Sequence, residues 1–232
     1  MSKILLSLAL SVLSASAQLS TEVNELGDGR SQVTITNTSG VPLEAFVATW
    51  ITPEPSGSRR PSLTYHDALL QVGSKTVPNT FMVGGADAQI QVHGIFQDGS
   101  TYGDPQWIEG IRKTRVYYLQ ALDAFLAELR AASPTTSQVG LVQQLSETRD
   151  RLIAAAKNTI QSPNSETPNF SYMFLRDASG RGIRLVYTFL VRNITKPPAQ
   201  SNGAMALPDM LTTLIDMLSA QRSKLAPHVA SN

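Results

Sequence analysis

His66 and Asp67 are the one place in the chain where a histidine and an acid are adjacent, as a hydrolytic triad would use them. A triad also needs a nucleophile within hydrogen-bond reach of the histidine, and the nearest candidates are Ser58 and Ser62. Because successive residues of a strand point to opposite faces, His66 and Asp67 should not share a site. The chain also lacks a Gly-x-Ser-x-Gly nucleophile elbow. We therefore interpret His66 as a surface histidine and Asp67 as an aspartate that stabilises a turn.

Metal and cofactor chemistry finds little support in the residue spacing. No two histidines have the spacing of a zinc-binding helix, and the chain has no cysteine, which excludes thiolate ligands, disulfides and a cysteine nucleophile. No glycine-rich segment carries the companion residues of a phosphate-binding loop. The sequence therefore predicts no catalytic residue, no metal ligand and no cofactor. The three histidines are His66, His93 and His228.

The segment 96–107 is the remaining candidate site. Asp98-Gly99 is typical of a turn, and Asp104-Pro105 is typical of a helix start, with Asp104 as N-cap and Pro105 at the first helical position. Trp107 would then act as a wedge between the two halves of the protein. The alternative is a small binding site at the seam between those halves, where pockets tend to form. Its residues would be Asp98, Tyr102, Asp104 and Trp107, but we favour the structural interpretation.

The elements that position these residues change type along the chain. Up to about Phe96, apolar residues alternate with polar ones in short runs separated by turn signals, which predicts a small antiparallel β-sandwich of the immunoglobulin type. After Pro105 the apolar residues recur every three to four positions, which predicts helices. The fold class is therefore α+β. The predicted strands are residues 33–37, 43–50, 64–71, 80–83 and 88–96, and the predicted helices are residues 105–129, 139–160 and 208–225.

Four details of the helical half are further expectations. The short connection at Ser133-Pro134 predicts that the first two helices form a long antiparallel hairpin. In the segment 169–193, apolar residues alternate as in a strand, but polar residues also recur four positions apart, as on one face of a helix. We favour a helix. Arg115 is expected to lay its stem on the apolar stripe and to keep its charge in solvent. The tail from Ala226 is expected to fray.

Residues 1–17 read as a signal peptide. Lys3 precedes an apolar run over residues 4–13, and Ala15-Ser16-Ala17 matches an A-x-A cleavage site that would leave Gln18 first. The expected organisation is a signal peptide (1–17), a β-sandwich domain (18–103) and an α-helical domain (104–232). An exported chain without cysteine suits a bacterial periplasm or medium.

Charge excludes some partners. The whole chain has 19 basic and 18 acidic residues, and removal of Lys3 with the signal leaves 18 of each. A neutral chain offers no electrostatic footprint for nucleic acid or anionic lipid. No later segment is apolar enough to span a bilayer, so we expect no integral membrane segment after cleavage. The hydrophobic content of 42% is sufficient for a sizeable core.

Three motifs carry a resemblance to a known group. They are Asn37-x-Ser39-Gly40-x-Pro42, Tyr65-x-Asp67-x-Leu69-Leu70 and Phe96-x-Asp98-Gly99-Ser100-x-x-Gly103-Asp104-Pro105-x-Trp107. In these the chain resembles uncharacterised exported bacterial proteins, many from acidobacteria, that join a small β-sandwich to a helical C-terminal half. The chain departs from the group at Val77-Pro78-Asn79, where a Pro-Gly pair is usual. The resemblance implies a fold and no activity.

Three functions remain open, and the sequence does not decide the oligomeric state. The favoured hypothesis is a non-enzymatic module of the cell envelope or medium that binds another envelope or secreted protein. The second is a hydrolase with a site at the seam that uses Asp98, Asp104 and His66. The third is a small-molecule carrier whose cavity lies in the helical half; its lining would be Tyr118, Phe125, Phe170, Tyr172 and Phe189.

Overall fold

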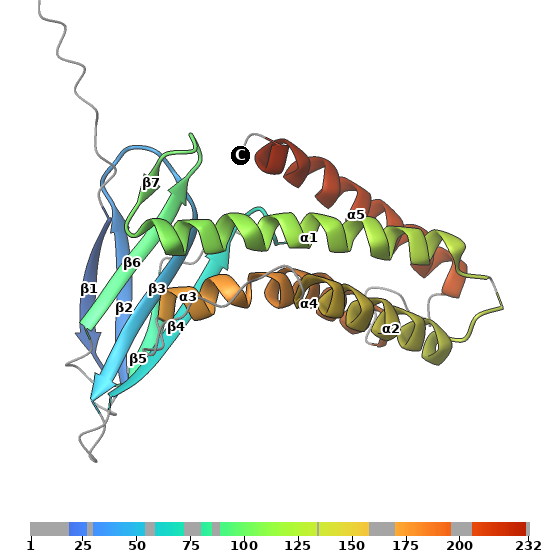
Figure 1. Ribbon diagram of the computed structural model, residues 1–232, viewed down its shortest axis with the longest axis horizontal. Helices are drawn as coiled ribbons and strands as arrows, with labels where there is room; N and C mark the ends of the chain where they lie inside the picture. The colour runs from blue at the N-terminus through green and yellow to red at the C-terminus, as the bar shows by residue number, and fades with distance from the viewer. Residues whose placement is uncertain are drawn as a thin grey trace, which may run out of the picture.

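The computed structural model describes residues 19–26, 30–53, 59–71, 80–84, 89–133, 135–157, 170–195 and 206–230. The predicted signal peptide (1–17) and the predicted end of the second helix at residues 158–160 lie outside these ranges. Strands fill the N-terminal half and helices the C-terminal half, so the predicted α+β class is confirmed (Figure 1). The strands are β1 (Leu19–Glu25), β2 (Arg30–Asn37), β3 (Leu43–Pro53), β4 (Arg59–Asp67), β5 (Thr80–Gly84), β6 (Gln89–Phe96) and β7 (Thr101–Tyr102). The helices are α1 (Pro105–Ala131), α2 (Gln138–Lys157), α3 (Phe170–Arg176), α4 (Ala178–Thr195) and α5 (Leu207–Ala230).

The strands form two antiparallel sheets with the orders β1-β2-β5 and β4-β3-β6-β7. Strand β3 is buried on both faces. Its Phe46 and Ala48 pack with Leu19 and Ile35 of the first sheet, in an apolar layer that joins the two sheets. The alternate residues of β3 point toward the helices instead. A strand covered on both sides reads as a nearly continuous apolar run, as residues 45–48 do here.

The helices run side by side away from the sheets (Figure 1). One end of α1 lies on the β4-β3-β6-β7 sheet, and its remaining length packs mainly against α4 and α5. Helix α2 packs mainly against α4 and meets α1 to a smaller extent, for example where the Thr148 hydroxyl donates to Glu128 (2.8 Å). No helix within the described ranges combines the length and the hydropathy that a bilayer-spanning segment requires.

Two expectations about helix extent have clear outcomes. Residues 170–176 (α3) and 178–195 (α4) are helical, which confirms the preferred interpretation of the ambiguous segment. The expected fraying from Ala226 is wrong, because α5 continues to Ala230. Its last turns are fixed to the β half: Leu225 is fully buried, and the Lys224 ammonium donates to the Ala68 carbonyl (2.9 Å).

Helices α1 and α4 approach closely at a glycine. A Cβ built on Gly182 would lie 2.6 Å from the Thr114 carbonyl oxygen and 2.7 Å from the Tyr118 amide nitrogen. Both of these are backbone atoms of α1, so no side-chain rotation could make room. The absence of a side chain at position 182 therefore sets the distance between the two helices.

We expect Gly182→Ala to lower the free energy of unfolding by about 1–3 kcal/mol, because the two backbones must separate. Gly140→Ala is the matched control, since its Cβ would meet only the Ser137 and Thr136 side chains at 3.3 and 3.6 Å. Gly140→Ala should raise the free energy of unfolding by up to about 1 kcal/mol, because alanine has a higher helix propensity than glycine. Urea denaturation measures both variants, and equal effects would contradict the close approach.

Candidate functional site

The candidate site is the seam, which we define as the layer where α1 and α3 lie on the β4-β3-β6-β7 sheet. Its apolar part is a cluster of residues from two strands of the sheet, β3 and β6, and from the helices α1 and α3. Burial of such a cluster stabilises the contact by about 25 cal/mol for each Å² removed from water. The polar groups of the seam must be accommodated inside this apolar surround. The apolar members are Ala45, Val47, Ile95, Trp107, Ile108, Ile111 and Phe174.

A buried ion-pair cluster of Arg115, Asp67 and Glu44 lies beside this apolar part. The Arg115 Nε donates to Asp67 Oδ2 (2.7 Å) and Nη2 donates to Asp67 Oδ1 (3.0 Å). The same Nη2 lies 2.8 Å from Glu44 Oε1. The side chains are 4% (Arg115), 1% (Asp67) and 8% (Glu44) exposed. The expectation that Arg115 keeps its charge in solvent is therefore wrong, because two carboxylates from β3 and β4 meet it at the sheet surface.

Asp67 is held by further donors. The Tyr65 hydroxyl donates to Oδ2 (3.0 Å) and the Leu69 amide donates to Oδ1 (2.9 Å). The predicted turn-stabilising role of Asp67 is thus confirmed, but the ion pair with Arg115 was not predicted. Burial raises the pKa of Tyr65, and the neighbouring Asp67 carboxylate raises it further, so this hydroxyl remains a donor. Burial lowers the pKa of Arg115, but attraction to Asp67 and Glu44 outweighs it, and the net pKa is raised.

A second arginine, Arg181 of α4, also reaches the seam, where it donates hydrogen bonds to a hydroxyl and to a backbone carbonyl. Its Nη1 donates to the Thr114 hydroxyl (2.7 Å) and its Nη2 donates to the Phe174 carbonyl (2.9 Å). The guanidinium lies 3.7 Å from the centroid of the Phe174 ring and 5.4 Å from that of Tyr65, a cation–π geometry. Burial lowers the pKa of Arg181. Arg115 and Arg181 therefore both reach the seam, and Arg115 meets Asp67 and Glu44 there.

A small hollow opens beside the ion-pair cluster. Its volume is about 70 Å³. The His228 Nδ1 of α5 lies 3.8 Å from the second oxygen of Glu44, so the hollow is bordered by α1, α5 and the sheet. The ion pair between Arg115 and Glu44 lies at this border. The lining residues are Glu44, Ile95, Phe96, Gln97, Gly99, Arg112, Arg115 and His228.

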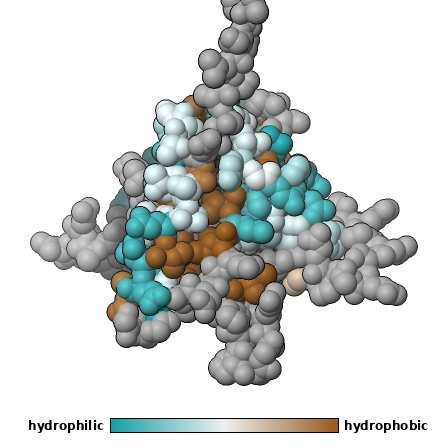
Figure 2. All heavy atoms as spheres, turned by 90° about the vertical axis from the view of Figure 1, so that its left-hand side faces the viewer, coloured by the Kyte–Doolittle hydropathy of each residue, from teal (hydrophilic) through white to brown (hydrophobic). Residues whose placement is uncertain are grey.

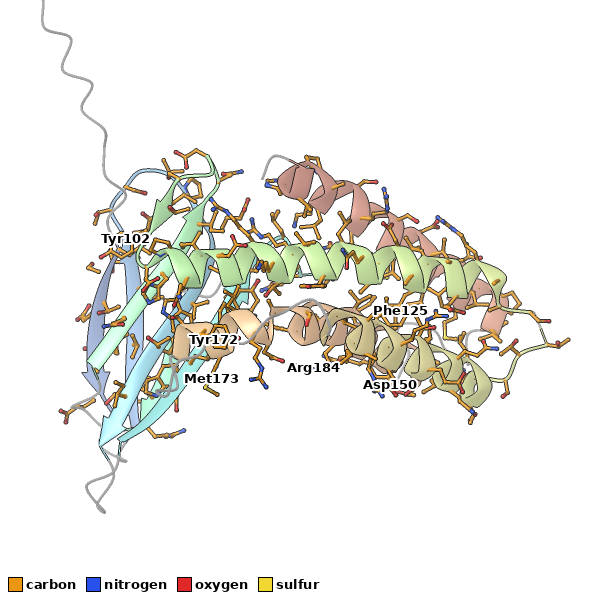
Figure 3. The ribbon with its side chains drawn as sticks, viewed as in Figure 1. Tyr102, Phe125, Asp150, Tyr172, Met173 and Arg184 are labelled. Carbon is orange, nitrogen blue, oxygen red and sulfur yellow. The ribbon has the colours of Figure 1, made fainter. Side chains whose placement is uncertain are left out.

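The four sequence-predicted site residues lie in three separate places. Asp104 and Trp107 lie together at the start of α1, where Asp104 is the N-cap, as predicted, and Trp107 stacks on His93 with ring centroids 5.3 Å apart. Asp98 lies on the exposed turn between β6 and β7, where hydrogen bonds from the Ser100 side chain and amide lower its pKa. Tyr102, labelled in Figure 3, packs against the apolar layer between the sheets.

The hydrolase residues do not meet. The His66 ring lies 5.1 Å from Phe46, on the face of the sheet that points to the first sheet. Asp67 lies on the opposite face with Arg115, as strand alternation predicts. Asp98 and Asp104 belong to the turn and the helix cap described above. Within the described ranges, no three histidine, aspartate or glutamate side chains come together in a way that could hold a metal ion.

The aromatic residues of the carrier hypothesis are spread over the helical half. Tyr118 and Phe125 are fully buried core residues, whereas Tyr172 is on α3 beside the sheet (Figure 3). Phe189 packs at the edge of the main core, and the Phe170 side chain lies outside the described part of the chain. A hollow of about 280 Å³ between α1 and α2 is lined instead by polar residues such as Glu128 and Arg151.

Sequence reasoning missed Glu44, Tyr65 and Arg181 as members of the seam. The available signal was the position of Arg115 within an apolar stripe, which required a buried partner from elsewhere in the chain. Comparison with protein-family models, with curated proteins and with solved structures finds no match to this chain. The functional argument therefore rests on the geometry of the seam.

We expect Arg115→Met to lower the free energy of unfolding by about 3–5 kcal/mol, because it leaves two buried carboxylates without a counterion. Arg222→Met, which breaks the exposed pair with Asp123, should have little effect. Adding Asp67→Asn and Glu44→Gln to Arg115→Met should restore part of the loss, since the buried charges are removed. Chemical denaturation at neutral pH measures all three, and a triple variant no better than Arg115→Met would contradict the assignment.

Proposed function

We propose that the protein is an exported, non-enzymatic binding or structural module whose β half and helical half are held in one fixed arrangement. The ion-pair cluster is the observation that carries this proposal. Arg115, Asp67 and Glu44 come from α1, β4 and β3, and they direct their hydrogen bonds at one another. Charged groups that are satisfied in this way orient elements and are not aimed at a substrate.

The bidentate contact supports a positioning role. A planar guanidinium on a carboxylate has one preferred geometry, so it fixes the rotation of α1 over the sheet as well as the distance. A buried ion pair adds little net stability compared with apolar residues, and its better-attested use is to specify one arrangement. A module that presents a binding surface benefits from such a rigid joint.

We extend the proposal to the finer fold, with an immunoglobulin-type sandwich in the β half and a hairpin of α1 and α2. An apolar layer that contains residues of both sheets supports the sandwich. The binding surface would lie on the sandwich face or on the helices. Figure 2 looks at the side of the protein where β1 lies, and hydrophobic side chains reach the surface there among hydrophilic ones. Leu26 (47% exposed), directly after β1, and Met82 (43%) on β5 are exposed, and so are Met173 (52%) on α3 and Leu185 (40%) on α4.

Export is part of the proposal, and the start of β1 supports it. The strand begins at Leu19, two residues after Ala17, and Leu19 is buried against the second sheet. All seven residues of β1 pair with β2. Cleavage after Ala17 would therefore leave the first sheet complete.

Expression of the full chain in a bacterial host should yield an exported form whose first residue is Gln18, because signal peptidase selects small residues in the A-x-A pattern. Intact-mass measurement of the secreted or periplasmic fraction checks the cleavage site. Ala17→Arg should block processing, whereas Ser16→Gln, at the unrestricted middle position, should not. A mature protein that retains residues 1–17 would refute export by this route.

The tagged mature chain should retain one stoichiometric partner from an envelope extract of its own source. We would compare it with two double variants, Leu26→Ser with Met82→Thr on the first sheet and Met173→Thr with Leu185→Thr on the helices. Loss of the partner in one double variant and not in the other would locate the surface. Failure of the unaltered chain to retain a partner, or turnover of ester, glycoside or peptide substrates, would overturn the proposed function.

A further inference from the structure

His93 connects the sheet to the first turn of α1. Its ring stands on β6, on the face that α1 covers, and stacks nearly parallel on Trp107, with 9° between the ring planes. Its Nδ1 accepts a hydrogen bond from the amide of Asp104 (3.0 Å). Asp104 is the N-cap of α1, and its carboxylate accepts from the Gln106 amide (2.7 Å). One imidazole therefore holds the residue at which α1 begins.

We propose that His93 is an acid-sensitive latch: the neutral ring holds the start of α1 on the sheet, and a proton on the ring releases it. The release would expose the apolar part of the seam around Trp107. The device regulates access to this surface and does not depend on the function proposed above.

The hydrogen bonds of the ring require its neutral form. Because Nδ1 accepts from an amide, the single proton of the neutral ring is on Nε2. Nε2 is buried and has no hydrogen-bond partner among the described residues. A second proton on Nδ1 would point at the Asp104 amide, so two donors would face each other and neither ring nitrogen would have an acceptor. A buried cation without acceptors is strongly disfavoured.

The packing prevents a local adjustment of the ring. A Cβ on Gly103 would overlap His93 Nδ1, so the backbone before α1 lies directly against the imidazole. Val47 of β3 is the cross-strand neighbour of His93, and Trp107 covers the ring. A protonated ring can find water only if the first turn of α1 moves away.

The charged groups around the ring set the direction of the pH effect. Burial lowers the pKa of His93, and the Asp104 carboxylate opposes this without reversing it. Val47 pairs with His93 across the sheet, Gly103 lies against its ring and Trp107 stacks on it, and none of the three carries a charge. The closed state therefore prefers the neutral ring, so its stability is fully present above the ordinary histidine pKa of 6.5 and declines as the pH falls below that value.

The release should remain local. Arg115, two turns further along α1, is fixed to Asp67 and Glu44 by contacts that involve no histidine. Loss of the His93 contact therefore frees only the turn that begins at Asp104.

Hydrogen exchange of the whole mature chain tests the latch. Amides of residues 106–111 should exchange at least about tenfold faster at about pH 5 than at about pH 7.5, after correction for intrinsic rates, while amides of residues 118–129 do not change. Equal acceleration in both segments would indicate global unfolding, and no acceleration would mean that the proton is accommodated in place. Either result overturns the proposal.

Two variants identify the titrating group. His93→Asn places an oxygen acceptor near the Nδ1 position and cannot titrate, so its first turn should stay protected at about pH 5. His66→Gln is the control, because burial also lowers the pKa of His66 and its Nε2 contacts the Thr64 hydroxyl (3.2 Å); it should open like the unaltered chain. If His93→Asn does not fold, NMR titration of the unaltered chain decides. An opening midpoint that differs from the His93 titration midpoint would refute the latch.

Discussion

The pairing of Arg115 with two carboxylates is the constraint on which the remainder of the structure depends. A guanidinium that is 4% exposed has lost nearly all contact with water, and it is stable there only because Asp67 and Glu44 replace that water. The three residues come from one helix and two strands, so each carboxylate meets the guanidinium only when α1 lies on the sheet. The seam is therefore cooperative: separating the halves would expose three charges whose partners are lost together.

The apolar and aromatic contacts of the seam are arranged around this constraint. The rings of Trp107 and Phe174 lie 5.1 Å apart, and Phe174 lies 5.7 Å from Tyr65, whose hydroxyl binds Asp67. Phe174 also fits against α1 where Gly110 has no side chain; a Cβ there would lie 2.5 Å from its ring. The Arg181 guanidinium lies over the ring of Phe174. The polar cluster fixes orientation, and the rings add large apolar surfaces to the contact.

Periodicity in the sequence was sufficient to predict much of the fold, because strands and helices each impose one spacing of apolar residues. It predicted β3, β6 and α1, the N-cap at Asp104 and the opposite orientation of His66 and Asp67. It could not predict the partner of Arg115, since Glu44 and Asp67 lie 71 and 48 positions earlier and reach it only through strand pairing. His93 shows the same limit. Alternation predicted that His93 and Val92 point to opposite faces of the sheet. Which of these faces α1 covers is decided by tertiary packing.

The motifs that carried the resemblance acquire a physical meaning from these contacts. In Tyr65-x-Asp67-x-Leu69-Leu70, the Tyr65 hydroxyl and the Leu69 amide both donate hydrogen bonds to Asp67. Both leucines are buried in the main core. In the segment 96–107, Gly99 and Gly103 adopt positive φ angles of 84° and 97°, conformations that favour glycine. Gly103 also brings the backbone against His93, and Trp107 covers that ring. Both motifs therefore specify how the strands connect to α1. A chain that resembles this one only in these motifs would be expected to share the joint, while its binding surface could differ completely.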